Sequence, residues 1–175
     1  MADSIGKVEL PAALDEESAA GEAARTVLGE RLYRHAATEF DVPGIHLGVF
    51  YAGSPVVVPD GTPAPADDSH RYTPSAVPGA RAPHVWLEDG VSIFDRFGRD
   101  FTLVRFNPRV PSEAIGAAAR ELGLPLAVVD VASEEARDLY ARDLVLVRPD
   151  HHVAWRGNSE PGDTEALLAR VAGHP

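Results

Sequence analysis

Two strand-like runs separated by a helix-like stretch, in the second half of the chain, constrain the fold more than any other feature. Residues 101–106 are rich in β-branched and aromatic side chains, which favours a strand. Ser112 can cap a helix over 112–122, and Gly123 is a stop signal for it. Residues 125–131 are nearly continuously apolar, which is typical of a parallel strand covered on both faces. These segments predict a βαβ unit.

The C-terminal part of the chain predicts two more helices around a hairpin. A short helix follows Ser133, because two glutamates suited to a first helical turn come next. The apolar runs 144–147 and 152–155 flank an Arg-Pro-Asp-His turn, which indicates two antiparallel strands. Asp163 then caps a last helix.

The order βαβ, short helix, ββα predicts an α/β domain with a thioredoxin-like fold over residues 91–173. An additional strand is expected at 91–94, where the run Val-Ser-Ile-Phe precedes a segment that contains Gly98. This strand would form a hairpin with 101–106.

The first half of the chain predicts an arm, a helix and a long loop. We interpret 1–17 as a flexible acidic arm and 18–40 as an amphipathic helix that ends before Pro43. Residues 45–51 alternate in places like a short strand. Residues 59–84 are rich in Pro, Gly, Asp and Ala and predict an extended loop, which could serve an interface because such long loops are uncommon. The apolar positions of the helix are Ala24, Val27, Leu28, Leu32, Ala36 and Phe40.

The composition excludes several classes of function. The chain has no cysteine, so it can form no disulfide, thiolate nucleophile or Cys-ligated zinc site. Its formal net charge of -11 disfavours binding to nucleic acid or to an anionic membrane surface. No apolar run approaches the roughly 20 residues that span a bilayer, and the first residues lack the features of a signal peptide. We expect a cytoplasmic protein.

Three blocks of unusual composition occur at 47–55, 72–87 and 148–156. The middle block is the most diagnostic, because Pro-Gly-x-Arg-Ala-Pro-His is followed by Trp-Leu and then by Asp89-Gly90. Together with the Phe-Asp-x-Phe-Gly segment at 94–98, the blocks resemble the C-terminal regions of flavin-dependent aromatic-ring hydroxylases, the class of phenol and polyketide hydroxylases. Their matching order argues against a chance match.

The resemblance implies that the chain corresponds to the part of such enzymes that follows the flavin domain. In the full-length enzymes that domain binds FAD through a Gly-x-Gly-x-x-Gly turn, and no such turn occurs here. We therefore expect no cofactor in this chain and assign no catalytic residue. By resemblance, 18–90 would join the flavin domain and 91–173 would be a mainly structural terminal domain. The family generally lacks the redox dithiol of thioredoxin, and here Asn-Pro-Arg-Val at 107–110 stands in its place.

Several residues are candidate structural or interface positions. Arg81 and His84 lie in a proline-stiffened segment with Trp86 as an apolar anchor, and we prefer an internal contact over a contact with a partner. Trp155 ends the hairpin and is expected in the core or at an interface. The corresponding apolar candidates on the helix are Leu28, Leu32 and Phe40.

No metal site is assigned. His151 and His152 stand beside Asp150, but adjacent residues on a strand point to opposite faces and cannot easily chelate one ion. A polar hairpin turn is the preferred interpretation.

The favoured function is a non-catalytic structural or assembly module. Its expected partner is a second copy of the chain or a flavin-domain protein, reached through the helix at 18–40 or the loop at 59–84. One alternative is a stand-alone small-molecule binding protein with a pocket between that loop and the sheet. Another is a subunit or fragment of an aromatic-ring monooxygenase that is active only with a separate flavin domain. The sequence also leaves open that the helix folds back onto its own sheet.

Overall fold

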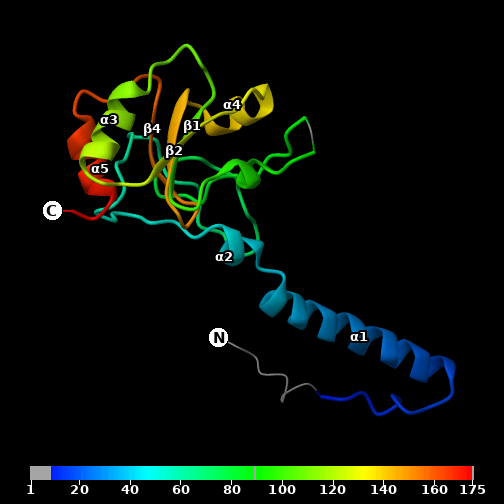
Figure 1. Ribbon diagram of the computed structural model, residues 1–175. Helices are drawn as coiled ribbons and strands as arrows, with labels where there is room; N and C mark the ends of the chain where they lie inside the picture. The colour runs from blue at the N-terminus through cyan, green and yellow to red at the C-terminus, as the bar shows by residue number, and fades with distance from the viewer. Residues whose placement is uncertain (1–8, 89, 175) are drawn as a thin grey trace.

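The computed structural model describes residues 9–88 and 90–174. Its centre is a four-stranded mixed sheet in the order β2-β1-β3-β4. The parallel pair is β1 with β2, while β1 with β3 and β3 with β4 are antiparallel. The predicted α/β class, with βαβ followed by a helix, a hairpin and a helix, is confirmed (Figure 1). The strands are β1 (Phe101–Arg105), β2 (Leu126–Asp130), β3 (Leu144–Val147) and β4 (Val153–Gly157).

Alternate side chains of the strands fill two hydrophobic cores, one on each face of the sheet. Leu103 of β1 belongs to the core shared with α3 (Glu113–Glu121) and α5 (Thr164–Val171). The next residue, Val104, belongs to the other core, shared with α4 (Glu134–Tyr140). This division follows from the two-residue period of a strand. Helices therefore cover both faces, as Figure 1 shows.

Two helices begin at their predicted caps and a third begins differently. The side chains of Ser133 and Asp163 accept hydrogen bonds from backbone N–H groups of their own helices, at 3.2 and 2.8 Å. Ser112 stands at the N-cap of α3, but its side chain accepts no capping bond. Instead, Oε1 of Glu160 accepts from the backbone N–H of Ile115 at 2.8 Å. A carboxylate from the loop before α5 thus satisfies the first turn of α3.

The prediction of a strand at 45–51 is wrong. The chain forms α2 (Pro43–Leu47) there, because Pro43 is suited to the first helical position. Gly44 also permits the turn to approach a neighbouring loop, since a Cβ on Gly44 would lie 1.7 Å from the carbonyl oxygen of Asp68. Beyond α2 the chain makes only an isolated bridge at Phe50.

The prediction of a strand at 91–94 is also wrong, and so is the prediction that this segment forms a hairpin with β1. Ser92 Oγ accepts from the backbone N–H of Phe94, while the Asp95 carboxylate accepts from the backbone N–H of Ser92, both at 3.2 Å. This capping box closes the 3-10 helix η2 (Ile93–Arg96). The segment therefore turns instead of extending along the sheet.

The prediction that 125–131 is covered on both faces is wrong as well. β2 is an edge strand with β1 as its one neighbour in the sheet, and Val128 at its centre is 45% exposed. The apolar run indicated a strand correctly, but the position of that strand in the sheet depends on where β3 pairs.

The helix predicted at 18–40 is confirmed as α1 (Ala19–Phe40), with Ser18 as its N-cap. Figure 1 shows α1 projecting away from the sheet and its covering helices. The alternative that this helix folds back onto its own sheet is therefore wrong. Leu32 is 40% exposed and Phe40 is 75% exposed. No helix among the described residues is long and apolar enough to cross a membrane.

Candidate functional site

The three blocks that carry the family resemblance meet beside β4. Backbone hydrogen bonds join Gly79 and Ala80 to Val153 of β4 at 2.8 and 2.9 Å. On the opposite side, the backbone N–H of Tyr51 donates to the carbonyl of Gly79 at 2.8 Å. The middle block therefore lies as an extended segment between the first block and the third.

Side chains of the first and third blocks reinforce this arrangement. The rings of Tyr51 and His152 stack with their centroids 4.2 Å apart and their planes 13° from parallel. The Tyr51 hydroxyl donates to Oδ2 of Asp150 at 3.4 Å. Burial acts to raise the pKa of the Asp150 carboxyl, but the backbone N–H of His152 and the charge of Arg148 hold this pKa below its usual value. Asp150 is thus an ionised link in the hairpin turn.

Three of the predicted candidates lie together: Arg81 and His84 contact Phe94, and Trp86 contacts His84. The guanidinium carbon of Arg81 lies 4.9 Å from the centroid of the Phe94 ring, which is cation–π geometry. The His84 ring meets Phe94 and Trp86 edge-on, with centroids 5.4 and 4.8 Å apart. Trp86 is largely exposed. The internal contact expected of Arg81 and His84 is with Phe94, and contact of Trp86 with a partner stays a prediction.

Sequence reasoning missed a buried polar network that ties the proline-rich loop to the sheet. Nε of Arg156 donates to Oδ2 of Asp60 at 2.8 Å, and another of its nitrogens donates to Oγ1 of Thr62 at 3.1 Å. A third bond reaches the carbonyl of Tyr140, also at 3.1 Å. Burial acts to raise the pKa of the Asp60 carboxyl, but hydrogen bonds from Thr62 and Arg156 lower it below its usual value. An aspartate in a proline-rich loop carries no sequence signal for such a role.

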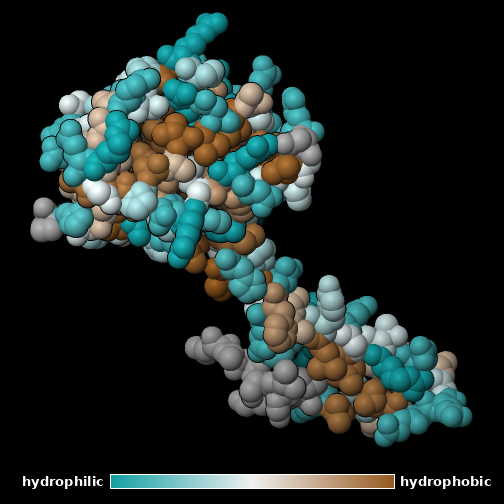
Figure 2. Space-filling model, in the orientation of Figure 1, coloured by the Kyte–Doolittle hydropathy of each residue, from teal (hydrophilic) through white to brown (hydrophobic). Residues whose placement is uncertain are grey.

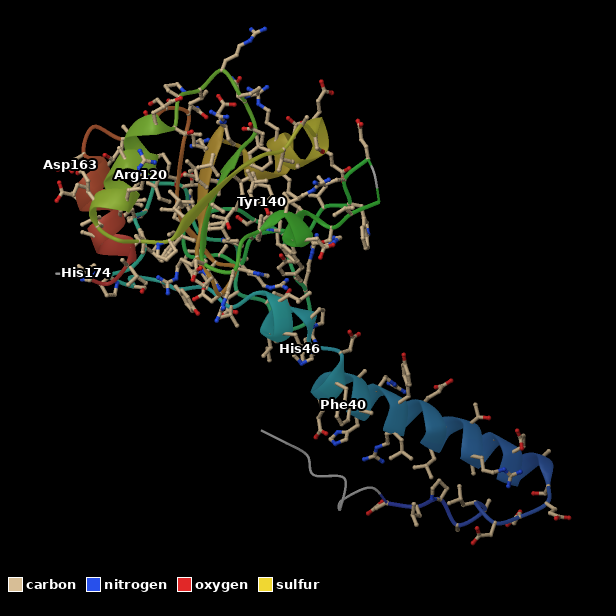
Figure 3. All side chains as sticks on the ribbon, in the orientation of Figure 1. Phe40, His46, Arg120, Tyr140, Asp163 and His174 are labelled. Carbon is tan, nitrogen blue, oxygen red and sulfur yellow. The ribbon has the colours of Figure 1, made fainter. Side chains whose placement is uncertain are left out.

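Tyr140 provides a second link that the sequence did not indicate. Its hydroxyl donates to the carbonyl of Pro83 at 2.8 Å from a fully buried position. Burial, together with the nearby Tyr72, raises the pKa of Tyr140. Figure 3 places the Tyr140 side chain within the body, well away from α1.

Trp155 is a core residue. It is buried in the core beneath α3 and α5, and its ring lies so close to Gly157 that a Cβ there would come within 2.7 Å of it.

The candidates on α1 lie apart from this cluster and do not form a straight stripe. Each step of four residues rotates a side chain by about 40° around the helix axis, so Phe40 lies about 120° from Leu28. Figure 2 shows apolar side chains along one side of α1. Phe40 and His46 lie at the junction between α1 and the body in Figure 3.

A cavity of about 490 Å³ opens between α2 and the loop that begins at residue 64. Phe50, Tyr72, Ala80 and Arg81 are among the residues that line it. Within 9–88 and 90–174, no group of three or more His, Cys, Asp or Glu side chains is arranged to hold a metal ion.

The turn between β1 and α3, which opens the βαβ unit, does not fit a dinucleotide pyrophosphate. It contains no glycine, and the N-terminus of α3 already receives the carboxylate of Glu160 at the backbone N–H of Ile115. Glu113 adds a second acid in that first turn. A phosphate would be repelled where a Rossmann turn attracts it.

A family model described as "aromatic-ring hydroxylase, C-terminal" matches residues 75–175. The FAD-dependent monooxygenase opdD of Penicillium oxalicum is 40% identical over 129 residues, which are 69% of this chain and 25% of that protein. The phenol 2-monooxygenase of a Pseudomonas strain is 33% identical over 152 residues, 76% of this chain and 25% of that protein.

Solved structures show the same relationship. The substrate-free rebeccamycin biosynthetic enzyme REBC superposes with a TM-score of 0.78 at 40% identity, covering 97% of this chain and 31% of that one. A ternary complex of aklavinone-11 hydroxylase with FAD and aklavinone gives a TM-score of 0.59 at 31% identity over 74% of this chain. The chain thus spans a quarter of the length of the two curated relatives and under a third of REBC.

Proposed function

Because this chain belongs to the aromatic-ring hydroxylase C-terminal family, we propose that it is the assembly module of a flavin-dependent aromatic monooxygenase. In this role it catalyses no step itself. It packs through α1 against a flavin-bearing domain, and in the isolated chain the same helix pairs with a second copy.

The observation that carries this proposal is the exposure of α1. A single helix of this length gains most of its stability from packing, yet α1 projects away from the body (Figure 1) with Leu32 and Phe40 exposed. Exposed apolar surface of this kind commonly marks an interaction site. The matched relatives are three to four times longer than the aligned region, so they contain further chain that could cover it.

The proposal that this chain catalyses no step itself is supported by the residues that it lacks and by the acids at its βα turn. The chain has no cysteine, and its βα turn carries acids where a flavin pyrophosphate would need donors. The element order resembles a thioredoxin-like domain, and the chain lacks the dithiol that redox chemistry in such a domain requires. Links such as Tyr51 to Asp150 and Arg156 to Asp60 connect the loops of this body to its sheet and hairpin.

Sedimentation velocity of Leu32→Asp and its parent tests the helix. The parent is expected to dimerise, since twofold dimers are the commonest closed assembly, and Leu32→Asp is expected to be monomeric because it places a charge in the apolar contact. Ala23→Asp is the matched control, since Ala23 lies nine residues from Leu32 and hence on the opposite side of the helix. A parent that stays monomeric at high micromolar concentration refutes pairing between copies.

The flavin-bearing partner needs a separate measurement. The tagged parent and tagged Leu32→Asp are mixed with the flavin domain of the opdD relative expressed without its own C-terminal quarter. Co-elution of flavin absorbance with the parent, and its loss with Leu32→Asp, is expected. Equal recovery of flavin with both proteins would place the contact elsewhere and contradict the proposal.

A further inference from the structure

The cavity beside α2 is a formed hollow and not a gap between mobile segments. Its walls are held together where the backbone N–H of Gly44 donates to the carbonyl of Ser69 at 3.1 Å. Asp68 then accepts from the backbone N–H of His70 at 2.9 Å. Its volume of about 490 Å³ lies within the range of roughly 300–1,000 Å³ that is typical of small-molecule sites.

The lining is apolar on the side of α2 and the segment that follows it. Ile45 and Val49 are both well exposed at the cavity, so their aliphatic side chains meet water in the isolated chain. Phe50 contributes an aromatic ring to the same lining. A ring-sized apolar group would remove this surface from water.

Two arginines that line the cavity lack an acidic partner among the residues that the structure describes. Arg71 and Arg81 both line the cavity, and neither forms an ion pair with any carboxylate of the described residues. In a chain whose net charge is -11, five arginines of the body, Arg156 among them, form an ion pair with an acid.

Two further polar features of the cavity set the charge that a ligand meets. The Tyr72 hydroxyl is buried without a hydrogen-bond partner among the described residues. Burial raises the pKa of Tyr72 against the opposing charge of Arg81, so this tyrosine adds no negative charge. Asp67 and Asp68 lie on the loop side of the cavity and disfavour a ligand with several negative charges.

We propose that this cavity binds a small apolar monoanion, an aromatic carboxylate whose ring contacts Ile45, Val49 and Phe50 and whose carboxylate faces Arg71 and Arg81. Guanidinium and carboxylate form paired charge-assisted hydrogen bonds, and the apolar wall accommodates the ring. The site is separate from the face of α1 proposed above and does not depend on that proposal.

Isothermal titration of the full chain with 1-naphthoate tests the site, with 1-naphthamide as the neutral isostere and adenosine monophosphate as the phosphate probe. Naphthoate is expected to bind at one saturable site, and the amide about tenfold or more weakly, the scale of one charge-assisted bond. Arg71→Gln and Arg81→Gln are each expected to weaken naphthoate binding several-fold. Arg31→Gln, on α1, is the matched control and is expected to change nothing.

Ala66→Trp, which fills the exposed rim of the cavity, is expected to abolish naphthoate binding without unfolding the chain. Equal binding of the amide, tighter binding of the nucleotide, or full binding by Ala66→Trp would each overturn the proposal. So would an absence of naphthoate binding at millimolar concentration. If the monomeric variant Leu32→Asp binds naphthoate and the parent does not, the second copy of the chain occupies this cavity in the parent. That result would likewise overturn the proposal.

Discussion

Replacement of Arg156 by methionine removes the guanidinium that ties the proline-rich loop to the sheet while keeping most of the volume of the side chain. The Arg156 side chain is 4% exposed and its partner Asp60 is 12% exposed. Breaking a buried ion pair by removing one partner costs about 3–5 kcal/mol. A second guanidinium, from Arg142, lies 3.5 Å from Asp60 and compensates in part. We therefore expect Arg156→Met to lower the free energy of unfolding by about 3 kcal/mol.

A double-mutant cycle with Asp60→Asn isolates the contribution of the pair. Urea denaturation of the parent, both single variants and the double variant is followed by tryptophan fluorescence and by far-UV circular dichroism. The background is Leu32→Asp, so that self-association does not add to the measured free energy. The expected coupling energy between Arg156 and Asp60 is about 1–3 kcal/mol.

The control cycle uses Arg34 and Glu30, an ion pair on α1 whose side chains are 77% and 67% exposed. Solvent-exposed pairs typically couple by less than about 1 kcal/mol. If the Arg156–Asp60 coupling does not exceed that of the control pair, the reasoning that this network anchors the loop is refuted.

Three other predictions concern the folded body. Tyr140→Phe removes the hydroxyl that donates to Pro83 and should lower stability by about 1–3 kcal/mol, because a buried carbonyl loses its donor; thermal denaturation measures this. Gly157→Ala should cost about 1–3 kcal/mol, because the new methyl group meets the ring of buried Trp155; urea denaturation with fluorescence detection measures it. The carboxyl of Asp60 has a lowered folded-state pKa, so its contribution to stability is present above its unfolded pKa of about 3.9 and is lost as the pH falls through the lower folded value. Asp60→Asn should make acid denaturation less steep.

Contrasting variants separate these effects from general damage. Gly162→Ala adds a methyl group with nothing within 4 Å of it and should leave stability nearly unchanged. Tyr33→Phe removes an exposed hydroxyl on α1 and should also be neutral. A loss of stability in either control equal to that in the corresponding test variant would contradict the proposed cause.

Local patterns in the sequence identified the elements that local physics decides. The two-residue alternation of β1 separates Leu103 from Val104 into opposite cores, and such periodicity can be recognised without knowing the partner strands. Ser133 and Asp163 cap their helices within three residues of themselves. For the same reason the α/β class and the order of its elements followed from the sequence.

Two short segments were mistaken because their decisive interactions were not visible in apolar periodicity. The segment at 45–51 alternates like a strand, but the turn around Gly44 packs against Asp68. The segment at 91–94 is β-rich in composition, yet the reciprocal hydrogen bonds of Ser92 and Asp95 close a helical turn. Runs of four to seven residues carry too little periodic signal to outweigh such contacts.

By itself the sequence determined the class of fold, the family resemblance and the candidate residues around the middle block. The tertiary structure alone decided that β2 lies at an edge of the sheet and that α1 projects away from the body. It also decided that Asp60 pairs with Arg156, which lies 96 positions away in the chain. Caps and strand alternation arise among neighbours in the chain, so a sequence displays them. Ion pairs, sheet position and cavities arise among segments brought together only when the chain closes long loops, and no local pattern specifies which segments those will be.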